Sequence, residues 1–391
     1  MFCSSPGQTY FIALFGGEIR AALSLSHGQF GAIYSAATLC SALILLWSGS
    51  LLDRLTLPTV TLFVSVGLVV SSWLLSQTAG VMSLFIAILL LRQFGQGLTG
   101  MTSVTTMMRY VPEHRAKANA LAHMGYSAAE ALLPMIVVGL LLWMSWREIW
   151  QWVGLVLLLG LPIFALALLK SHRTQQARTL ERGEHSLLPT DSVYQWTRAQ
   201  VVRDPLFYAI LPGLTCQSLL YTGFMFHQVH MVEQKGWALT VWASLYLVFS
   251  LTTIVMSFIF GSIIDRWGSL RVIPWINVPM MLGLLVLATT ESIIGALVFM
   301  LCMAVSTAGQ AANSGPYYST RYGNKNLGAI KSLGTFYMVI MTALSPIVLG
   351  LFFDAGSSVN ALALGGVVYA LIVSTVAHWG CRQARLKPHP Q

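Results

Sequence analysis

The hexapeptide Gly-Ser-Leu-Leu-Asp-Arg occupies residues 49–54, and Gly-Ser-Ile-Ile-Asp-Arg occupies residues 261–266, at an offset of 212. The same offset relates Gly97 to Gly309, Arg109 to Arg321 and Pro134 to Pro346. Chance can produce one such match, but a constant offset sustained over about eighty residues indicates an internal duplication.

The composition places this duplicated chain in a membrane. The 391 residues are 56% hydrophobic and 9% charged, with a mean hydropathy of +0.70, whereas an average soluble domain has about 25% charged residues. So few charges cannot cover a soluble fold of this length, which excludes a cytosolic enzyme and a disordered chain. The five cysteines are scattered singly, which excludes a disulfide scaffold and a cysteine metal site. We therefore predict an all-α membrane protein that is not an enzyme and has no metal or cofactor.

Apolar stretches of about 20 residues predict twelve membrane-spanning helices. They cover residues 2–18, 28–50, 58–77, 81–109, 116–142, 148–170, 205–231, 239–262, 271–290, 292–320, 327–353 and 358–380. A polar, charged stretch separates the sixth from the seventh. The predicted organisation is a six-helix half at 1–170, a cytoplasmic linker at 171–204, a second half at 205–381 and a tail at 382–391. Asp204-Pro205 is a predicted helix start, with an N-cap followed by proline at the first position.

The distribution of Lys and Arg predicts the orientation. With the N-terminus inside, 18 of the 22 basic residues fall on the cytoplasmic side. They are Arg54, Arg109, Arg115, Lys117, Lys170, Arg173, Arg178, Arg182, Arg198, Arg203, Arg266, Arg271, Arg321, Lys325, Lys331, Arg382, Arg385 and Lys387. Arg20, Arg147 and Lys235 fall outside, and Arg92 lies within a span. The net charge of +9 therefore reports an N-in, C-in topology, and we do not predict a nucleic-acid partner.

The repeated Asp-Arg hexapeptides carry a family resemblance. Gly-x-x-x-Asp-Arg between spans 2 and 3, and again between spans 8 and 9, resembles motif A of the major facilitator superfamily. Residues 5–10, 92–97 and Glu130 with Pro134 are similar to the bacterial branch related to monocarboxylate and oxalate/formate carriers. The resemblance implies a monomeric secondary transporter working by alternating access in a bacterial cytoplasmic (inner) membrane. It also implies two parallel six-helix halves with a substrate site between them near the midplane.

Two charges at membrane depth are the leading candidate functional residues, because a charge there costs roughly 2.5–3.5 kcal/mol. Arg92 lies far from either end of its span and presents a planar fork suited to a carboxylate. Glu130 is a candidate proton carrier, since burial raises a carboxyl pKa and a nearby arginine lowers it. We hypothesise a proton- and substrate-sensitive pair; the alternative is a fixed structural ion pair.

Polar side chains on spans 1, 4, 7 and 10, which line the central cavity in the superfamily, are further candidates. They are Gln8, Thr9, Tyr10, Gln93, Gln96, Thr99, Gln217, Tyr221, Gln310, Asn313 and Tyr317. An uncharged lining with one cation favours a small organic anion over a polyvalent phosphate ester. We expect proton-coupled symport of such an anion. Many of these groups could equally hold helices together. The alternatives are an exporter of amphipathic compounds and a non-transporting sensor on a carrier scaffold.

The motif residues are predicted to act mechanically. Asp53 and Asp265 would accept hydrogen bonds from a helix N-terminus in only one of the inward- and outward-facing states and so bias that equilibrium. Gly49, Arg54, Gly261 and Arg266 complete the two motifs, and Arg109 and Arg321 are candidate partners of the aspartates.

Three further features of the sequence carry expectations. From Phe2 to Gly17 the first span gives about 24 Å of helix, short for a hydrocarbon core of about 30 Å, and Pro6-Gly7 interrupts it. We expect the true start to lie upstream of Met1; a short tilted helix is the alternative. The glycines at 95, 97 and 100 predict close helix packing and not a nucleotide loop. His227 and His230 predict hydrogen-bonded neutral histidines and not a metal site.

Overall fold

The computed structural model describes residues 1–48, 57–103, 115–160, 195–323 and 326–386. Within these ranges every regular element is a helix and no strand occurs. The chain divides into two compact units, Met1–Pro189 and Thr190–Gln391. The predicted all-α membrane fold is confirmed.

Ten helices in the described ranges are long and apolar enough to cross a membrane. They are His27–Leu45, Thr59–Ser76, Val81–Ser103, His123–Leu141, Pro205–Phe226, Leu239–Trp267, Ser269–Thr289, Ile293–Tyr322, Ile330–Asp354 and Val359–Leu386. Two expected spans are missing from this set for different reasons. Residues 2–18 do not form one continuous helix, and the span expected at 148–170 is helical over 146–160 but continues outside the described residues. The count of twelve stays a prediction.

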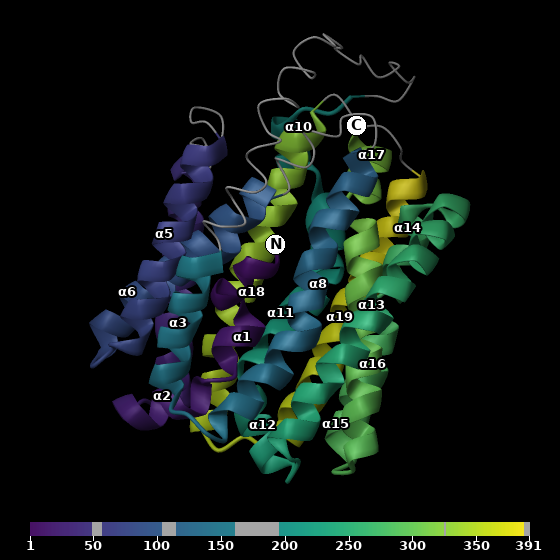
Figure 1. Ribbon diagram of the computed structural model, residues 1–391. Helices are drawn as coiled ribbons and strands as arrows, with labels where there is room; N and C mark the ends of the chain where they lie inside the picture. The colour runs from purple at the N-terminus through teal and green to yellow at the C-terminus, as the bar shows by residue number, and fades with distance from the viewer. Residues whose placement is uncertain (49–56, 104–114, 161–194, 324–325, 387–391) are drawn as a thin grey trace. The chain divides into compact units, whose positions relative to one another are not determined.

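The described part of the first unit contains a broken segment, three long helices, a helix with a π-helical continuation and a further helix over 146–160 (Figure 1). The broken segment consists of η1 (Phe2–Gly7), α1 (Thr9–Ala13) and α2 (Gly16–Leu23). It is followed by α3 (His27–Ser48), α5 (Leu57–Ser76), α6 (Val81–Leu91), the π-helix η2 (Arg92–Thr99) and α8 (Arg115–Leu141). Helices α3 and α5 both pack on α6 and η2, while η1 packs on η2 and α8.

The break in the first segment falls at Pro6-Gly7, as the sequence predicts. Pro6 has no N–H to donate within a helix, and η1 is a short 3-10 helix that ends at Gly7. Gln8 follows in an extended conformation (φ −89°, ψ 148°) before α1 begins. The carbonyls at the end of η1 are therefore left without partners in their own helix.

In the second unit two helices, α11 and α15, each pack against two others. Its elements are α10 (Arg198–Arg203), α11 (Pro205–Phe226), α12 (Gln228–Gln234), α13 (Leu239–Trp267), α14 (Ser269–Val272), η4 (Ile273–Trp275), α15 (Val278–Thr289), α16 (Ile293–Asn313), α17 (Pro316–Tyr322), α18 (Leu327–Asp354) and α19 (Val359–Leu386). Helix α15 packs on α16 and α19, and α11 packs on α18 and α19. Helix α16 also packs along α13.

Two of the three basic residues expected on the outer side cap helix C-termini. The Nη1 of Arg147 donates to the carbonyl of Ser76, the last residue of α5, at 2.8 Å. The ammonium of Lys235 donates to the carbonyls of Leu287 and Thr290 at the end of α15. Burial lowers the pKa of Lys235, an effect that the Glu291 carboxylate opposes. A cation suits a helix C-terminus because unpaired carbonyls gather there, so these exceptions to the charge bias have a structural role.

The start of α11 is anchored by a buried ion pair. As predicted, Asp204 is its N-cap and accepts from the backbone N–H of Leu206, with Pro205 at the first position. The same carboxylate lies 3.3 Å from the Nη2 of Arg321 on α17 and accepts from the hydroxyl of Tyr322. The Nη1 of Arg321 donates to the carbonyl of Ala384 on α19. The Asp204–Arg321 ion pair therefore ties together the ends of α11, α17 and α19.

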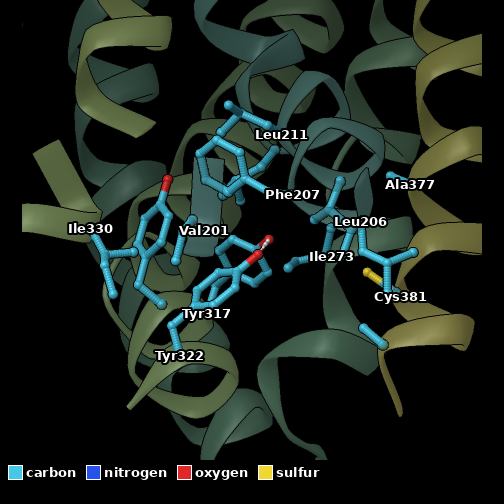
Figure 2. Close-up of a cluster of buried hydrophobic side chains, with 14 of the residues drawn as sticks. Val201, Leu206, Phe207, Leu211, Ile273, Tyr317, Tyr322, Ile330, Ala377 and Cys381 are labelled. Atoms are coloured by element: carbon cyan, nitrogen blue, oxygen red, sulfur yellow. Dashed lines mark hydrogen bonds between the residues drawn. The ribbon is translucent and has the colours of Figure 1, made fainter. Parts of the chain in front are cut away.

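An apolar cluster excludes water from this ion pair. Figure 2 shows Tyr317 and Tyr322 facing Leu206, Phe207 and Ile273. Helix α19 contributes Ala377 and Cys381 to the same cluster. In such a low-dielectric setting a charge that loses its partner is costly.

We predict that Asp204→Asn destabilises the second unit. The amide keeps an acceptor for the helix cap but leaves the buried Arg321 without a counter-charge, for an expected loss of about 3 kcal/mol. The thermal midpoint in detergent should fall by about 6–12 °C, measured with a thiol-reactive dye that reports exposure of the buried Cys216 and Cys381. Asp265→Asn is the matched control at an exposed aspartate. Equal midpoints for the two variants would contradict the prediction.

Candidate functional site

Arg92 begins the π-helix η2 and is almost fully buried, with 4% of its surface exposed. Its Nη1 donates to the carbonyl of Gly7 at 3.0 Å and lies 3.4 Å from the Oγ1 of Thr9. The guanidinium lies 5.3 Å from the centre of the Tyr34 ring. Tyr34 in turn donates its hydroxyl proton to Thr9 at 2.7 Å. The arginine is thus positioned by the broken first segment and by α3.

The contact between Arg92 and the first segment requires two glycines. A Cβ placed on Gly95 would lie 2.7 Å from both the N and the Cα of Gly7, and a Cβ on Gly7 would collide with the carbonyl oxygen of Leu91. Backbone therefore touches backbone where η1 crosses η2, which no side chain would allow. The prediction of close helix packing is confirmed for Gly95 and for Gly97, where an added Cβ would lie 3.0 Å from the Leu45 side chain, but it is wrong for Gly100, where an added Cβ would meet nothing within 4 Å. A π-helical turn is uncommon and recurs at functional sites, and here it lies at the crossing.

The charge of Arg92 is not matched by a carboxylate. Arg92 contacts neutral oxygens and a ring face, and no carboxylate of the described residues pairs with it. Its buried Nε has no hydrogen-bond partner among the described residues. A buried guanidinium without a carboxylate partner can bind an anion through N–H donors that are already positioned.

Glu130 lies on α8 and is also buried. Its Oε1 lies 3.4 Å from the hydroxyl of Tyr126, whose ring meets the ring of Tyr10 edge to face at 5.9 Å. Tyr10 donates to the Oγ of Ser5 on η1. The structure therefore does not join Arg92 and Glu130 directly as a fixed ion pair; each reaches the broken first segment, Arg92 at Gly7 and Glu130 by way of Tyr126 and Tyr10.

The remaining predicted residues of the first unit lie around this crossing. The Nε2 of Gln8 donates to Ser4 at 3.4 Å, and Gln96 on η2 is exposed. The buried Gln93 joins η2 to α3, since it accepts from Ser41 and donates to Ser48. Sequence reasoning missed Tyr34, whose only signal was a tyrosine in the middle of an apolar span.

The predicted polar residues of the second unit lie in helix contacts. Gln310 on α16 donates to the carbonyl of Leu214 and to Ser218, both on α11. Gln217 on α11 donates to Thr307 on α16. These bonds fit the alternative reading, in which polar side chains hold helices together.

Three other predicted residues of the second unit are engaged elsewhere. Asn313 is fully buried and accepts from Ser269, Tyr317 lies within the cluster of Figure 2, and the ring of Tyr221 stacks on Phe249. A substrate role for any of them stays a prediction.

Half of the motif residues can be located. Gly49, Asp53, Arg54 and Arg109 lie outside the described residues. Gly261, Asp265 and Arg266 form the last turns of α13, and both charged side chains are exposed. Among the described residues Asp265 has no ion-pair partner, because Arg321 pairs with Asp204.

The outer histidines contact protein groups. The Nε2 of His227 lies 2.9 Å from the carbonyl oxygen of Pro346, and the ring of His230 meets Phe353. The described ranges contain no group of three metal-ligating side chains.

Comparison with known proteins identifies the family of this chain. The profile of the Major Facilitator Superfamily matches residues 1–346. The chain belongs to this superfamily. It is therefore a multi-pass membrane transporter, with the two-unit helical architecture described above. The superfamily profile does not separate one branch from another, so the monocarboxylate-like branch stays a prediction.

Solved structures share the fold of this superfamily member at low sequence identity. A bacterial homologue of the human lysosomal transporter Spinster, in an inward-facing and occupied conformation, matches with a TM-score of 0.70 and 13% identity, over 100% of this chain and 96% of that chain. The nucleoside transporter NupG matches with a TM-score of 0.72 and 13% identity, over 99% of this chain and 97% of that chain. A search of curated protein sequences finds no match.

We predict that Gly95→Ala disturbs the crossing that positions Arg92. The added methyl group would have to displace the Gly7 backbone, at an expected cost of about 1–3 kcal/mol in stability. The matched control is Gly100→Ala one turn further on, where an added Cβ meets nothing within 4 Å. Thermal midpoints in detergent measure both, and an equal or higher midpoint for Gly95→Ala than for Gly100→Ala would show that the crossing is not tight.

Proposed function

We propose that this transporter is a proton-coupled symporter of a small, singly charged organic anion, of the monocarboxylate type. The observation that carries the proposal is the buried Arg92, whose guanidinium has no carboxylate partner among the described residues. A desolvated cation without a counter-ion raises the free energy of the empty carrier. An anionic substrate removes that cost when it binds.

The chemistry of the site favours one negative charge. Arg92 is the one cation buried around the η1–η2 crossing in the described residues, and its remaining neighbours are hydroxyls, a carbonyl and a ring. A polyvalent phosphate ester would call for several cations. The guanidinium still has an unpartnered N–H on Nε, and a carboxylate can accept from an arginine fork through two oxygens.

Glu130 is the proposed proton carrier. Its carboxyl is buried beside Tyr126 and reaches, through the Tyr10 ring, the same broken segment that Arg92 holds. Ionisable groups in the membrane commonly form proton pathways. Protonation of Glu130 before the loaded carrier reorients would keep the net charge of that step low. We place the protein, as the charge bias predicts, in a cytoplasmic membrane with both termini inside.

We predict that Arg92→Ala strongly reduces transport of a carboxylate and that Arg92→Lys only partly restores it. A charged hydrogen bond contributes about 1.5–3 kcal/mol, so uptake at limiting substrate should fall about 10- to 100-fold, and lysine keeps the charge without the fork. Uptake of a carboxylate panel into proteoliposomes is the measurement. Arg147→Ala is the control, since that arginine caps α5. Undiminished carboxylate uptake by Arg92→Ala would refute the anchor.

We further predict that Glu130→Gln uncouples transport from protons. The amide cannot release a proton, so substrate accumulation driven by an inwardly directed proton gradient should be lost. Exchange of internal for external substrate should persist. Both modes are measured in the same proteoliposomes, with Tyr126→Phe as a control that keeps the carboxyl. Accumulation that still follows the pH gradient in Glu130→Gln would assign the proton to another group.

A further inference from the structure

A basic basin lies at one end of α19, in the second unit. Four side chains, Arg271, His378, Arg382 and Arg385, line it together with Leu386, and its volume is 510 Å³. No residue of the basin belongs to the site proposed for the transported anion.

The basin is formed by one face of α19 and by the neighbouring α14. His378, Arg382 and Arg385 are spaced by four and three residues, so they share a face of the helix. Arg271 comes from α14, which packs on α19 in the second unit (Figure 1). All four side chains are exposed, and none has an ion-pair partner among the described residues. The basin is therefore a concentration of uncompensated positive charge.

The surface of α19 locates the basin relative to the bilayer. Its exposed side chains are predominantly apolar up to Val376 and include Val368, Leu371 and Ile372. Arg382 is six residues beyond Val376, about 9 Å along the helix. The headgroup region on each side of a bilayer is about 5–8 Å thick, and arginine side chains reach further along the surface. Arg382 therefore lies beside the headgroups, and Arg385, about 14 Å beyond Val376, can reach back toward them with its long side chain.

Two exposed tryptophans mark the same boundary. Trp275 on η4 is 65% exposed and Trp379 on α19 is 54% exposed. Each is four residues or fewer from a basin residue, Trp275 from Arg271 and Trp379 from Arg382. Exposed tryptophans on membrane proteins concentrate at the interface between hydrocarbon and headgroups. An aqueous solute site would not need this apolar rim.

We propose that this basin binds the phosphate of an anionic phospholipid headgroup. Arginine recognises phosphate through paired N–H donors, and basic pockets at the ends of transmembrane helices bind anionic headgroups. The acyl chains would run along the apolar face of α19 below Val376, and the phosphate would contact Arg382 and Arg385 from one helix and Arg271 from the other. The same chemistry would hold a soluble phosphate ester, which the experiment distinguishes.

The test measures lipid selectivity at Trp379. The full-length protein is reconstituted in phosphatidylcholine vesicles containing either brominated phosphatidylglycerol or brominated phosphatidylcholine. Bromine quenches the fluorescence of a nearby tryptophan. The quenching that is present in the parent protein and absent in Trp379→Phe therefore measures how much brominated lipid lies beside the basin. We expect phosphatidylglycerol to be preferred. Each arginine near an anionic headgroup contributes about fivefold in affinity, so Arg382→Gln with Arg385→Gln should reduce the preference by about 25-fold.

A matched pair of arginines controls for total charge. Arg198→Gln with Arg203→Gln removes two exposed arginines of the second unit outside the basin and should leave the preference within about twofold of the parent. If the paired variant of α19 does not fold, Arg271→Gln alone should reduce the preference about fivefold. An equal loss in the control pair, or no loss in either basin variant, would overturn the proposal.

A competition arm identifies the source of the phosphate. Inorganic phosphate and glycerol 3-phosphate are added to vesicles of the parent protein, and the quenching by phosphatidylglycerol is measured again. Unchanged quenching at millimolar concentrations supports a lipid ligand, because the lipid is held at the interface by its acyl chains. Displacement by either solute would assign the basin to a soluble phosphate and refute the lipid.

Discussion

The interior of a bilayer offers no water to a polar group, and the first unit is organised by this constraint. Pro6-Gly7 ends η1 and leaves carbonyls without helical partners. Arg92 lies in the neighbouring π-helix and donates to the carbonyl of Gly7. The carbonyl at the break gains a hydrogen-bond donor, and the buried arginine gains an acceptor. This contact is possible because Gly7 and Gly95 let the two backbones touch. The position of Arg92 depends on this crossing.

The two arginines that are buried among the described residues show how surroundings separate a structural charge from a functional one. Arg321 has a carboxylate, a carbonyl and a tyrosine ring around it, and it ties three helices together. Arg92 has hydrogen bonds to neutral oxygens and lacks a carboxylate among the described residues. Both cost free energy to bury. Only the second keeps the capacity to bind an anion from outside the protein, and it is therefore the one that we place in transport.

Several parts of the fold follow from local sequence because they depend on short-range effects. The apolar stretches predict helices, Asp204-Pro205 predicts a helix start, and Pro6-Gly7 predicts a break. The polar side chains of the second unit could not be assigned in this way. Gln310 and Gln217 have the composition of cavity-lining residues, but their hydrogen bonds run between α11 and α16. Periodicity shows which helix face a residue occupies but does not show which helix lies opposite.

The amino-acid sequence is sufficient to identify an all-helical membrane protein with an internal repeat, and its motif A resemblance implies a transporter. It also places the charges of Arg92 and Glu130 at membrane depth. Hydropathy, charge bias and a constant repeat offset are properties of the chain, and they need no tertiary contact to be read. The partner of each charge becomes visible only when the helices are packed together. Arg321 forms an ion pair with Asp204, Arg92 donates a hydrogen bond to the carbonyl of Gly7, and Glu130 accepts one from Tyr126. Such pairings depend on distances of a few ångströms between helices far apart in sequence, and hydropathy and spacing do not encode those distances.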